Sequence, residues 1–379
     1  MKYRKINDQY ESSILGLGCM RLPIVDGKYG EIDEEKAIEM IRYALDNGIN
    51  YIDTAYPYHE ESSEGLVGKA LLDGYREKAI LVTKNPVWKV EAYEDFEKYL
   101  DEQLDKLQTD YLDIYLLHAL NRKRWEIIEP MGCLKFMDEM LKKGKIKSAA
   151  FSIHDDFAFF KEVIDSYDWD LSMIQMNYMD VDAQTTVEAI QYAKDKGVPI
   201  AIMEPLKGGQ LAELPSSITA IWDQDPNKQQ PVYRALKWAA DFDNVKVILS
   251  GMSNMDQLKE NITYADQLEA GSLSIEEKEK YKEVKATLES RVQIPCTDCK
   301  YCMPCPAGVN IPANFRLYNS SYMYEDQEGR AKVYQTQVKE EFRADKCTEC
   351  GACEPQCPQD IKIIEGMKKV HERLSIPIQ

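Results

Sequence analysis

Eight of the ten cysteines in this chain lie in two short runs near its C-terminus, where their spacing could bind metal. A disulfide scaffold distributes its cysteines through a small secreted chain, whereas this chain has 379 residues. Its opening segment, MKYRKINDQYESSILGLGCM, lacks the apolar stretch and small-residue cleavage site of a secretory signal. The clustering therefore indicates thiolate–metal binding in a reducing compartment, and we expect a cytoplasmic protein.

The spacing inside each run indicates which metal group it would bind. The second run reads C-x2-C-x2-C-x3-C-P, the spacing with which bacterial ferredoxins hold a 4Fe–4S cube, and the first run is one residue shorter before its last cysteine. In two-cluster ferredoxins the fourth cysteine of such a run binds the other cube. By this analogy one cube would be held by Cys296, Cys299, Cys302 and Cys357. The other would be held by Cys305, Cys347, Cys350 and Cys353.

Two alternatives to this metal assignment stay open. Pairs of cysteines at C-x2-C spacing also form all-thiolate tetrahedral zinc sites. A single cube would leave several cysteines unused, and the shortened first run leaves the role of Cys305 open. Two runs that each end in Cys-Pro favour iron–sulfur clusters, two rather than one.

Four further polar residues fall at or just after the ends of three consecutive predicted strands. In a parallel barrel the chemistry is carried at these strand ends. Taken singly, a lysine there is commonly exposed to solvent, a histidine packs at the rim and an aspartate caps the loop. Their joint occurrence favours a shared site. The four are Asp53, Tyr58, Lys84 and His118.

The elements that would position these residues alternate along the chain. Near-continuous apolar strands are typical of a parallel sheet buried on both faces, and eight strand–helix repeats predict an α/β fold, a (β/α)8 TIM barrel. No G-x-G-x-x-G motif follows an early strand, so the usual fingerprint of the open dinucleotide fold is missing. The predicted strands are 14–18, 49–53, 79–84, 111–118, 148–152, 172–177, 199–203 and 245–251. The predicted helices between them include 34–47, 93–107, 134–143, 183–196 and 232–242; glycine follows or ends several of them, as left-handed C-caps require.

The composition changes after a last charged helix predicted over 275–291. We therefore divide the chain into a barrel domain, 1–290, and a small α-rich ferredoxin-like iron–sulfur domain, 291–379. The net charge of −18 argues against a nucleic-acid partner, which would need a basic face. No apolar run approaches the roughly 18 residues of a membrane helix, so we expect no membrane partner.

The barrel segments YIDTAYPYHEESSEGLVGKAL, AILVTK and YLDIYLLH resemble the aldo-keto reductase superfamily in order, spacing and strand placement. The cysteine segment resembles the subgroup of that superfamily that carries a C-terminal 4Fe–4S ferredoxin-type domain. The resemblance implies an NAD(P)H-dependent oxidoreductase that interconverts a small carbonyl compound and its alcohol. It also carries the catalytic tetrad of the family onto Asp53, Tyr58, Lys84 and His118.

Chemistry explains why such a tetrad needs these residue types. Hydride transfer to a carbonyl carbon creates an alkoxide that must receive a proton, and Tyr58 would donate it as general acid. A free phenol has a pKa near 10, so a neighbouring ammonium, Lys84, would favour its ionisation. Asp53 would keep Lys84 charged in a partly buried site. His118 would hydrogen-bond the carbonyl oxygen and polarise it.

The resemblance also implies where the nicotinamide cofactor binds. Ser152 and Gln175 match residues that hold the carboxamide, and His154 follows Ile153, which stands at the usual asparagine position. The stretch MEPLKGG lacks the aromatic residue that often stacks on the nicotinamide.

The segment SGMSNMDQLKEN after the last strand is similar to the phosphate-and-adenine loop of the family, with Gly251, Ser253 and Asn261 at matching positions. Gln257 stands where NADPH-preferring members carry arginine, which weakens the case for NADP over NAD without excluding either cofactor.

Three functions are compatible with this combination. A hydride carries two electrons whereas a cube passes one, and no flavin motif is present to couple them. The first hypothesis is a carbonyl reductase whose clusters organise the C-terminal segment, close the pocket or sense redox state. The second is an electron-transfer enzyme coupled to a flavin or to a redox partner such as ferredoxin. The third is a non-catalytic regulatory module, against which the intact tetrad counts.

Substrate specificity is expected in the segments after the fourth and seventh strands, 119–133 and 204–231. Trp125 and Trp222 lie in these segments, where they would line the pocket or pack at its rim. Cys19 and Cys133, outside the two runs, are expected to be small buried residues.

Overall fold

The computed structural model describes residues 1–222 and 229–378, which form two compact units. The first unit comprises Met1–Ala212 and Gln229–Ser274, and the second comprises Glu213–Lys228 and Ile275–Gln379. The domain boundary predicted after residue 290 falls inside the second unit. The reason is a helix pair, α8 and α11, in which the rings of Trp222 and Tyr281 lie 4.7 Å apart.

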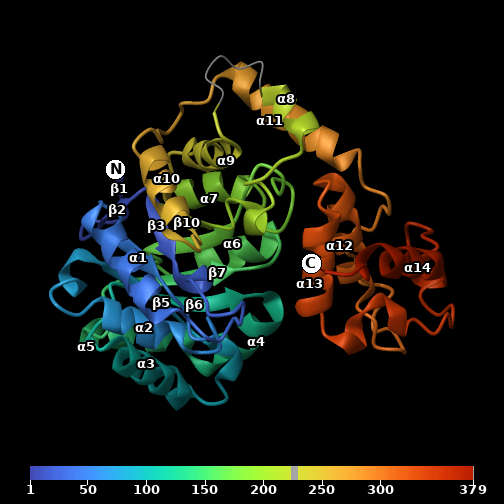
Figure 1. Cartoon of the computed structure of the whole chain (residues 1–379). Helices are drawn as coiled ribbons and strands as arrows, with labels where there is room; N and C mark the ends of the chain where they lie inside the picture. The colour runs from blue at the N-terminus through green and yellow to red at the C-terminus, as the bar shows by residue number, and fades with distance from the viewer. Residues whose placement is uncertain (223–228, 379) are drawn as a thin grey trace. The chain divides into compact units, whose positions relative to one another are not determined.

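The described part of the first unit contains eight parallel strands that close into a barrel, in the order β10-β3-β4-β5-β6-β7-β8-β9 (Figure 1). All eight predicted strands are confirmed to within a few residues. Their buried, almost wholly apolar sequences are the reason that they could be located. The strands are β3 Leu15–Gly18, β4 Tyr51–Asp53, β5 Ile80–Asn85, β6 Ile114–Leu120, β7 Ala149–Ile153, β8 Leu171–Gln175, β9 Ile200–Met203 and β10 Val245–Ser250.

Helices surround the barrel (Figure 1). In α1 the buried residues Ala37, Met40, Ile41, Ala44 and Leu45 recur at helical spacing. The glycine expected after α5 is the left-handed C-cap Gly144, with a φ of +75°. The helices are α1 Glu34–Asp46, α2 Ser63–Ala70, α3 Tyr93–Leu107, α4 Arg122–Met131, α5 Cys133–Lys143, α6 Phe157–Asp165, α7 Glu188–Asp195, α9 Pro231–Ala240 and α10 Met255–Ala265.

The interior of the barrel is packed, and an N-terminal hairpin covers the end at which the strands begin. Side chains such as Tyr51, Leu116 and Val247 form the interior cluster. The strands β1 Tyr3–Lys5 and β2 Glu11–Ser13 pair antiparallel and bring Ile6 and Tyr10 against this cluster. This hairpin was not predicted. It leaves the opposite end, where the strands finish, as the end at which a ligand can enter.

The second unit has its own core. Its helices are α8 Ser216–Trp222, α11 Ile275–Glu289, α12 Ile311–Met323, α13 Gln327–Thr336 and α14 Ile363–Leu374. Side chains of α12 and α14, among them Phe315, Met367 and Val370, form an apolar cluster. Six of the eight clustered cysteines pack against this cluster. The predicted metal-binding residues thus lie against the core of this unit.

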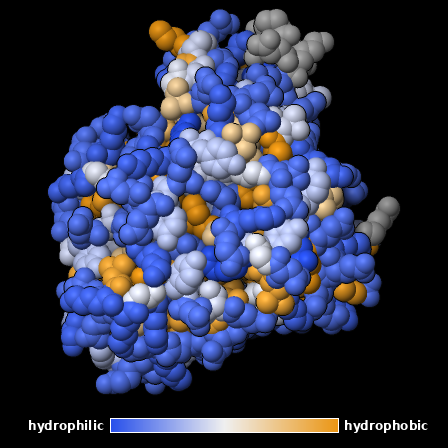
Figure 2. Space-filling view, turned by 90° about the vertical axis from the view of Figure 1, so that its left-hand side faces the viewer, coloured by the Kyte–Doolittle hydropathy of each residue, from blue (hydrophilic) through white to orange (hydrophobic). Residues whose placement is uncertain are grey.

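The surface in Figure 2 is mainly hydrophilic, with apolar residues scattered over it in small groups. Such scattered apolar residues are normal for the surface of a globular protein. Among the described residues, no helix is both long and apolar enough to span a bilayer.

Candidate active site and metal centre

The barrel delivers the predicted tetrad from three neighbouring strands. Asp53 is the last residue of β4, Lys84 lies one residue before the end of β5, and His118 lies near the end of β6. Tyr58 belongs to the loop after β4 and is half-buried. Parallel neighbouring strands finish at the same end of the barrel, so the four side chains converge there.

The ammonium of Lys84 is fully engaged by protein acceptors. Its Nζ donates to Asp53 Oδ1 at 2.8 Å, to the Thr54 carbonyl at 2.8 Å and to the Tyr58 hydroxyl at 3.2 Å. Lys84 is only 1% exposed and Asp53 2% exposed. Because an ammonium has three N–H donors, these contacts fix its position without any ligand.

Burial and neighbouring charge set the protonation of this group. Burial by itself would lower the pKa of Lys84, but the charges of Asp53 and Tyr58 outweigh it and raise that pKa, so the lysine is cationic. Burial raises the pKa of Tyr58 above 10, and the charge of Lys84 opposes the rise. Tyr58 therefore holds its proton at neutral pH, and the ammonium limits how tightly it is held.

His118 is placed by an irregularity in its strand. The pairing of β6 with β7 shifts between Leu117 and Leu120, and Ala119 has a left-handed φ of +52°. The Ala119 N–H donates to the Ser152 hydroxyl at 2.7 Å, which fixes the displaced backbone. A bulge of this kind re-aims a side chain beside an active site.

The imidazole of His118 is neutral and faces aromatic neighbours. Burial, followed by the charge of Lys84, lowers its pKa well below 6.5. Its ring centroid lies 6.3 Å from that of Tyr58 and 5.1 Å from that of Trp88. Its buried Nδ1 has no hydrogen-bond partner in the described part of the chain.

A second buried polar network lies behind Lys84 and was not foreseen from the sequence. The carboxyl of Glu64 on α2 accepts hydrogen bonds from Thr83 Oγ1 at 2.6 Å and from Gln103 on α3. Gln103 also donates to the Lys84 carbonyl at 3.0 Å, and its Oε1 accepts from the Tyr115 hydroxyl. The network ties two helices to the strand that carries the lysine.

The predicted nicotinamide residues lie at the ends of adjacent strands. Ser152 is on β7 and 1% exposed, and its hydroxyl still has a proton to donate after accepting from Ala119. Gln175 ends β8, and its Oε1 accepts from Gln184 at 3.1 Å. His154 follows β7 and is exposed.

The predicted phosphate-and-adenine loop connects β10 to α10. Gly251 and Ser253 are exposed, and Gln257 Oε1 accepts from the Ser253 N–H at 2.8 Å. Asn261 is buried and donates to Ser250 Oγ at 3.1 Å. The four residues thus lie along one loop and the helix that follows it.

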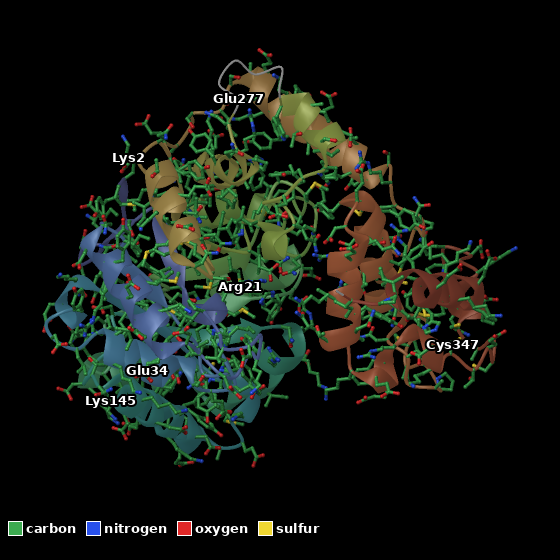
Figure 3. All side chains as sticks on the ribbon, viewed as in Figure 1. Lys2, Arg21, Glu34, Lys145, Glu277 and Cys347 are labelled. Carbon is green, nitrogen blue, oxygen red and sulfur yellow. The ribbon has the colours of Figure 1, made fainter. Side chains whose placement is uncertain are left out.

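Arg21, which follows β3, crosses this loop and was missed in the sequence (labelled in Figure 3). A Cβ atom on Gly251 would lie 3.0 Å from Arg21 Cδ, and one on Gly208 would lie 3.5 Å from its Nη2. Two glycines therefore make room for an exposed guanidinium between the loops after β9 and β10. This cation, together with the exposed loop, fits a bound dinucleotide phosphate.

The segments expected to set specificity are partly helical. Residues 122–131 form α4, and Trp125 within it is buried. Trp222 is also buried, in the second unit, where it packs on Tyr281. Residues 223–228 of the second predicted segment lie outside the described residues. Cys19 and Cys133 are both fully buried, as expected.

In the second unit the cysteines surround two hollows. Each hollow is lined by four cysteines, three from one run and one from the other, and each is bordered by Ile311 and Ile363. The cysteines around the first hollow are Cys305, Cys347, Cys350 and Cys353. Those around the second are Cys296, Cys299, Cys302 and Cys357; Figure 3 labels Cys347.

The two runs share one backbone conformation. The residue before the second cysteine of each run has a left-handed φ, +55° at Asp298 and +56° at Glu349. The residue after it is left-handed as well, +64° at Lys300 and +75° at Gly351. Non-glycine residues adopt this conformation rarely, so its repetition indicates two sites built for the same ligand.

The four cysteines around each hollow match the ligand set of a 4Fe–4S cube. A tetrahedral zinc would use four sulfurs converging at about 2.3 Å from one point.

Comparison with known proteins agrees with this architecture. The family model "Aldo/keto reductase family" matches residues 14–284, and the model "4Fe-4S dicluster domain" matches residues 295–361. Aldo-keto reductase YhdN of Bacillus subtilis (strain 168) is 29% identical over 272 residues, 68% of this chain and 76% of that protein. The NADH-specific methylglyoxal reductase of Escherichia coli (strain K12) is 26% identical over 298 residues, 66% of this chain and 89% of that protein.

Solved structures show the same fold. The holo form of an aldo-keto reductase from Bacillus halodurans superposes with a TM-score of 0.62 at 26% identity, covering 75% of this chain and 96% of that one. The family model extends over more than half of the chain, and the barrel is the fold that the resemblance implied. This chain therefore belongs to the aldo/keto reductase family of oxidoreductases and carries a 4Fe-4S dicluster domain after its barrel.

Proposed function

We propose that the barrel interconverts a carbonyl compound and its alcohol by NAD(P)H-dependent hydride transfer, with Tyr58 as the general acid. The observation that carries this proposal is the 3.2 Å contact between Lys84 Nζ and the Tyr58 hydroxyl, in a buried site where Asp53 holds the ammonium. A protonated phenol next to a fixed cation can release its proton to an oxygen that is becoming negative.

Each residue of the tetrad has one task in this reaction. The nicotinamide, when bound, supplies or accepts the hydride. Tyr58 gives its proton to the carbonyl oxygen, and Lys84 stabilises the phenolate that remains, by about 1.4 kcal/mol for each unit by which it lowers the tyrosine pKa. Asp53 keeps the ammonium in place. The neutral His118 donates a hydrogen bond to the same oxygen and orients it.

The cofactor would lie across the ends of β7, β8 and β10. Ser152, His154 and Gln175 would hold the carboxamide, and the loop after β10 would hold the phosphates and adenine through Gly251, Ser253, Gln257 and Asn261. Arg21 would add a cation beside the pyrophosphate. Because Gln257 is uncharged and already accepts from Ser253, we expect no strong preference for NADPH.

The second unit would hold two 4Fe–4S cubes with crossed ligation. The sets of four cysteines that line the two hollows support this assignment, and they give Cys305 a place in the cube of the other run. The structural role of such clusters is to hold two irregular cysteine segments in one core. The proposed carbonyl reduction requires no electron from them.

Substitution of the general acid tests the main proposal. Tyr58→Phe should lower kcat/KM for carbonyl reduction by about 10³-fold, within the usual range for a lost general acid, with iron content unchanged. Tyr56→Phe is the matched control. It also removes a tyrosine hydroxyl close to the site, but that hydroxyl donates to Glu102 on the outer side of the barrel. If Tyr58→Phe retains full activity, the mechanism is wrong.

A second candidate function, electron transfer, is favoured by one observation. Ile311 and Ile363 border both hollows, so two cubes would be near neighbours and could exchange electrons with each other and with an external ferredoxin. Visible spectra of the oxygen-free protein, taken before and after addition of NADH or NADPH, separate the two functions. A carbonyl reductase leaves the clusters oxidised, whereas bleaching by either nucleotide would support electron transfer.

A further inference from the structure

We infer that Arg124 binds a carboxylate on the substrate, so that the preferred substrates of the barrel are oxo acids. This inference rests on the proposed carbonyl reduction and names its substrate class. Nothing in the tetrad itself requires a charged substrate, because the tetrad acts on the carbonyl oxygen alone.

The position of Arg124 is beside the tetrad. Its guanidinium carbon lies 5.2 Å from the ring centroid of Trp88, and the same indole lies 5.1 Å from the ring of His118. Trp88 is 38% exposed, so this face is open to a ligand. A substrate carbonyl bound at His118 would thus be separated from the guanidinium of Arg124 by about the width of the Trp88 indole.

The charge of Arg124 has no acidic partner in the described part of the chain. Arg122, on the same helix as Arg124, forms an ion pair with Glu162 of α6 at 2.9 Å. None of the ion pairs found among the described residues involves Arg124. The guanidinium is half-buried, and burial lowers its pKa with no carboxylate raising it. A partly buried charge without a counter-ion is costly, and a ligand anion would relieve that cost.

The helix on which Arg124 lies adds to this imbalance. The first turn of α4 contains Arg122, Lys123 and Arg124 and no acidic residue. The N-terminal end of a helix carries partial positive charge, so cations there are unfavourable and anions favourable. The backbone N–H groups of Arg124 and Arg122 are already satisfied, because they donate to the side chains of Asn121 and Asp155. The guanidinium of Arg124 is therefore the group that would bind an anion.

Arg124 has donors to spare. One N–H, from Nη1, goes to the Ala119 carbonyl, whereas a guanidinium carries five. A carboxylate can bind two of those that remain in the parallel geometry that arginine favours. The contact with Ala119 has a second consequence, because this carbonyl belongs to the bulge beside His118, which the Ser152 hydroxyl also holds. A test must therefore separate substrate binding from positioning of that backbone.

Pairs of substrates that differ only in carrying a carboxylate or an amide distinguish substrate binding from positioning of the backbone. We would compare 4-carboxybenzaldehyde with 4-formylbenzamide, and 4-oxocyclohexanecarboxylate with 4-oxocyclohexanecarboxamide, on the full-length holoenzyme, because in each acid the carboxylate lies across a ring from the carbonyl. Arg124→Gln should raise KM for each acid by at least about 30-fold, or roughly 2 kcal/mol, with kcat within about 3-fold. The amides should change by less than about 3-fold in both parameters. Arg122→Gln is the control for a lost cation on the same helix turn.

Two outcomes would overturn the inference. Equal losses for acids and amides would show that Arg124 only positions His118, and unchanged acid kinetics would show that it binds no substrate. Arg124→Lys, which keeps the charge but not the paired donors, should recover part of the acid preference. Amide turnover by the wild-type enzyme reports the proposed carbonyl reduction separately, since it needs Tyr58 and not Arg124.

Binding measurements keep the inference testable even if no carbonyl is reduced. Calorimetric titration of the holoenzyme with NAD⁺ and 4-carboxybenzaldehyde, and then with 4-formylbenzamide, compares the two groups directly. We expect the acid to bind at least about 10-fold more tightly in the wild type and equally in Arg124→Gln. Equal affinities in the wild type would refute the carboxylate site.

Discussion

The barrel site and the cysteine hollows position their reactive side chains in opposite ways. In the barrel, Asp53, Lys84 and His118 come from separate strands of a packed framework, and the donors of Lys84 are satisfied by protein atoms. In the second unit the cysteines lie on irregular segments between helices, and six of the eight pack against the apolar core. The comparison indicates that the barrel site can form without a bound ligand, whereas in the second unit the proposed metal ligands pack against the core, so core and metal site depend on each other.

Loss of iron should have the largest effect on folding stability, and this effect should be confined to the second unit. Cys353→Ser should abolish iron binding and the cooperative unfolding of residues 291–379, because metal binding and folding are coupled in such small domains. The thermal transition of the barrel, followed by tryptophan fluorescence in a Trp222→Phe background, in which the remaining tryptophans all lie in the first unit, should shift by less than about 3 °C. Circular dichroism and iron analysis complete the measurement.

Cys133→Ala is the matched control for that variant. Cys133 is buried in the barrel unit and lies in neither run, so its loss should leave iron content unchanged. Protection of residues 291–379 against proteolysis in iron-free protein would break the comparison, since the second unit would then fold without its clusters.

Removal of the buried lysine should give the next largest effect, on the barrel alone. Lys84→Met would leave Asp53 as an unpaired buried charge, which costs about 3–5 kcal/mol of stability, and would lower kcat/KM about 100-fold or more. The double variant Lys84→Met with Asp53→Asn should regain most of the stability and none of the activity. Equal stability of the single and double variants would show that the pair is not electrostatically coupled.

The pH dependence of the reaction should reflect the two shifted pKa values of the site. Reduction needs a protonated Tyr58, and because burial raises its pKa, the rate should stay level at neutral pH and fall about tenfold per unit only above pH 10. Oxidation of the alcohol should rise over the same range. His118, with its lowered pKa, should add no limb near pH 6.5. A break near 6.5 that disappears in His118→Gln would contradict this assignment.

The smallest effect concerns the network behind Lys84. Burial raises the pKa of Glu64, so the folded protein keeps this carboxyl protonated at pH values where the unfolded chain ionises it. Its stabilising contribution is therefore complete below pH 4.5 and declines as pH rises towards the folded pKa, by at most about 1.4 kcal/mol per unit. Glu64→Gln should match the wild type at pH 4.5 and become relatively more stable at higher pH in urea titrations.

The exposed residue Glu39 supplies the control for this titration. Glu39→Gln makes the same change of side chain at an exposed position of the same unit, and so controls for the substitution itself. A Glu64→Gln variant that loses stability as pH rises would instead show that the buried group is an ionised carboxylate.

Much of the fold could be predicted because the eight parallel strands are buried on both faces and read as apolar runs. The convergence of Asp53, Tyr58 and Lys84 could be expected for the same reason, since neighbouring parallel strands end together. The bulge at Ala119 could not, because it depends on a hydrogen bond to Ser152, which lies on the neighbouring strand. A sequence does not reveal whether an arginine has a partner, so Arg124 and Arg21 became visible only in three dimensions.

The exchange of one cysteine between the two runs has a consequence for how the second unit assembles. Each hollow is lined by one cysteine of the opposite run, Cys305 or Cys357. The two runs are therefore interlocked, and neither hollow has all four cysteines unless both runs are in place. If each hollow holds a cube, as proposed, insertion of one cube would draw together the ligands of its neighbour. Maturation of this unit should be an all-or-none event that yields chains with both cubes or with none.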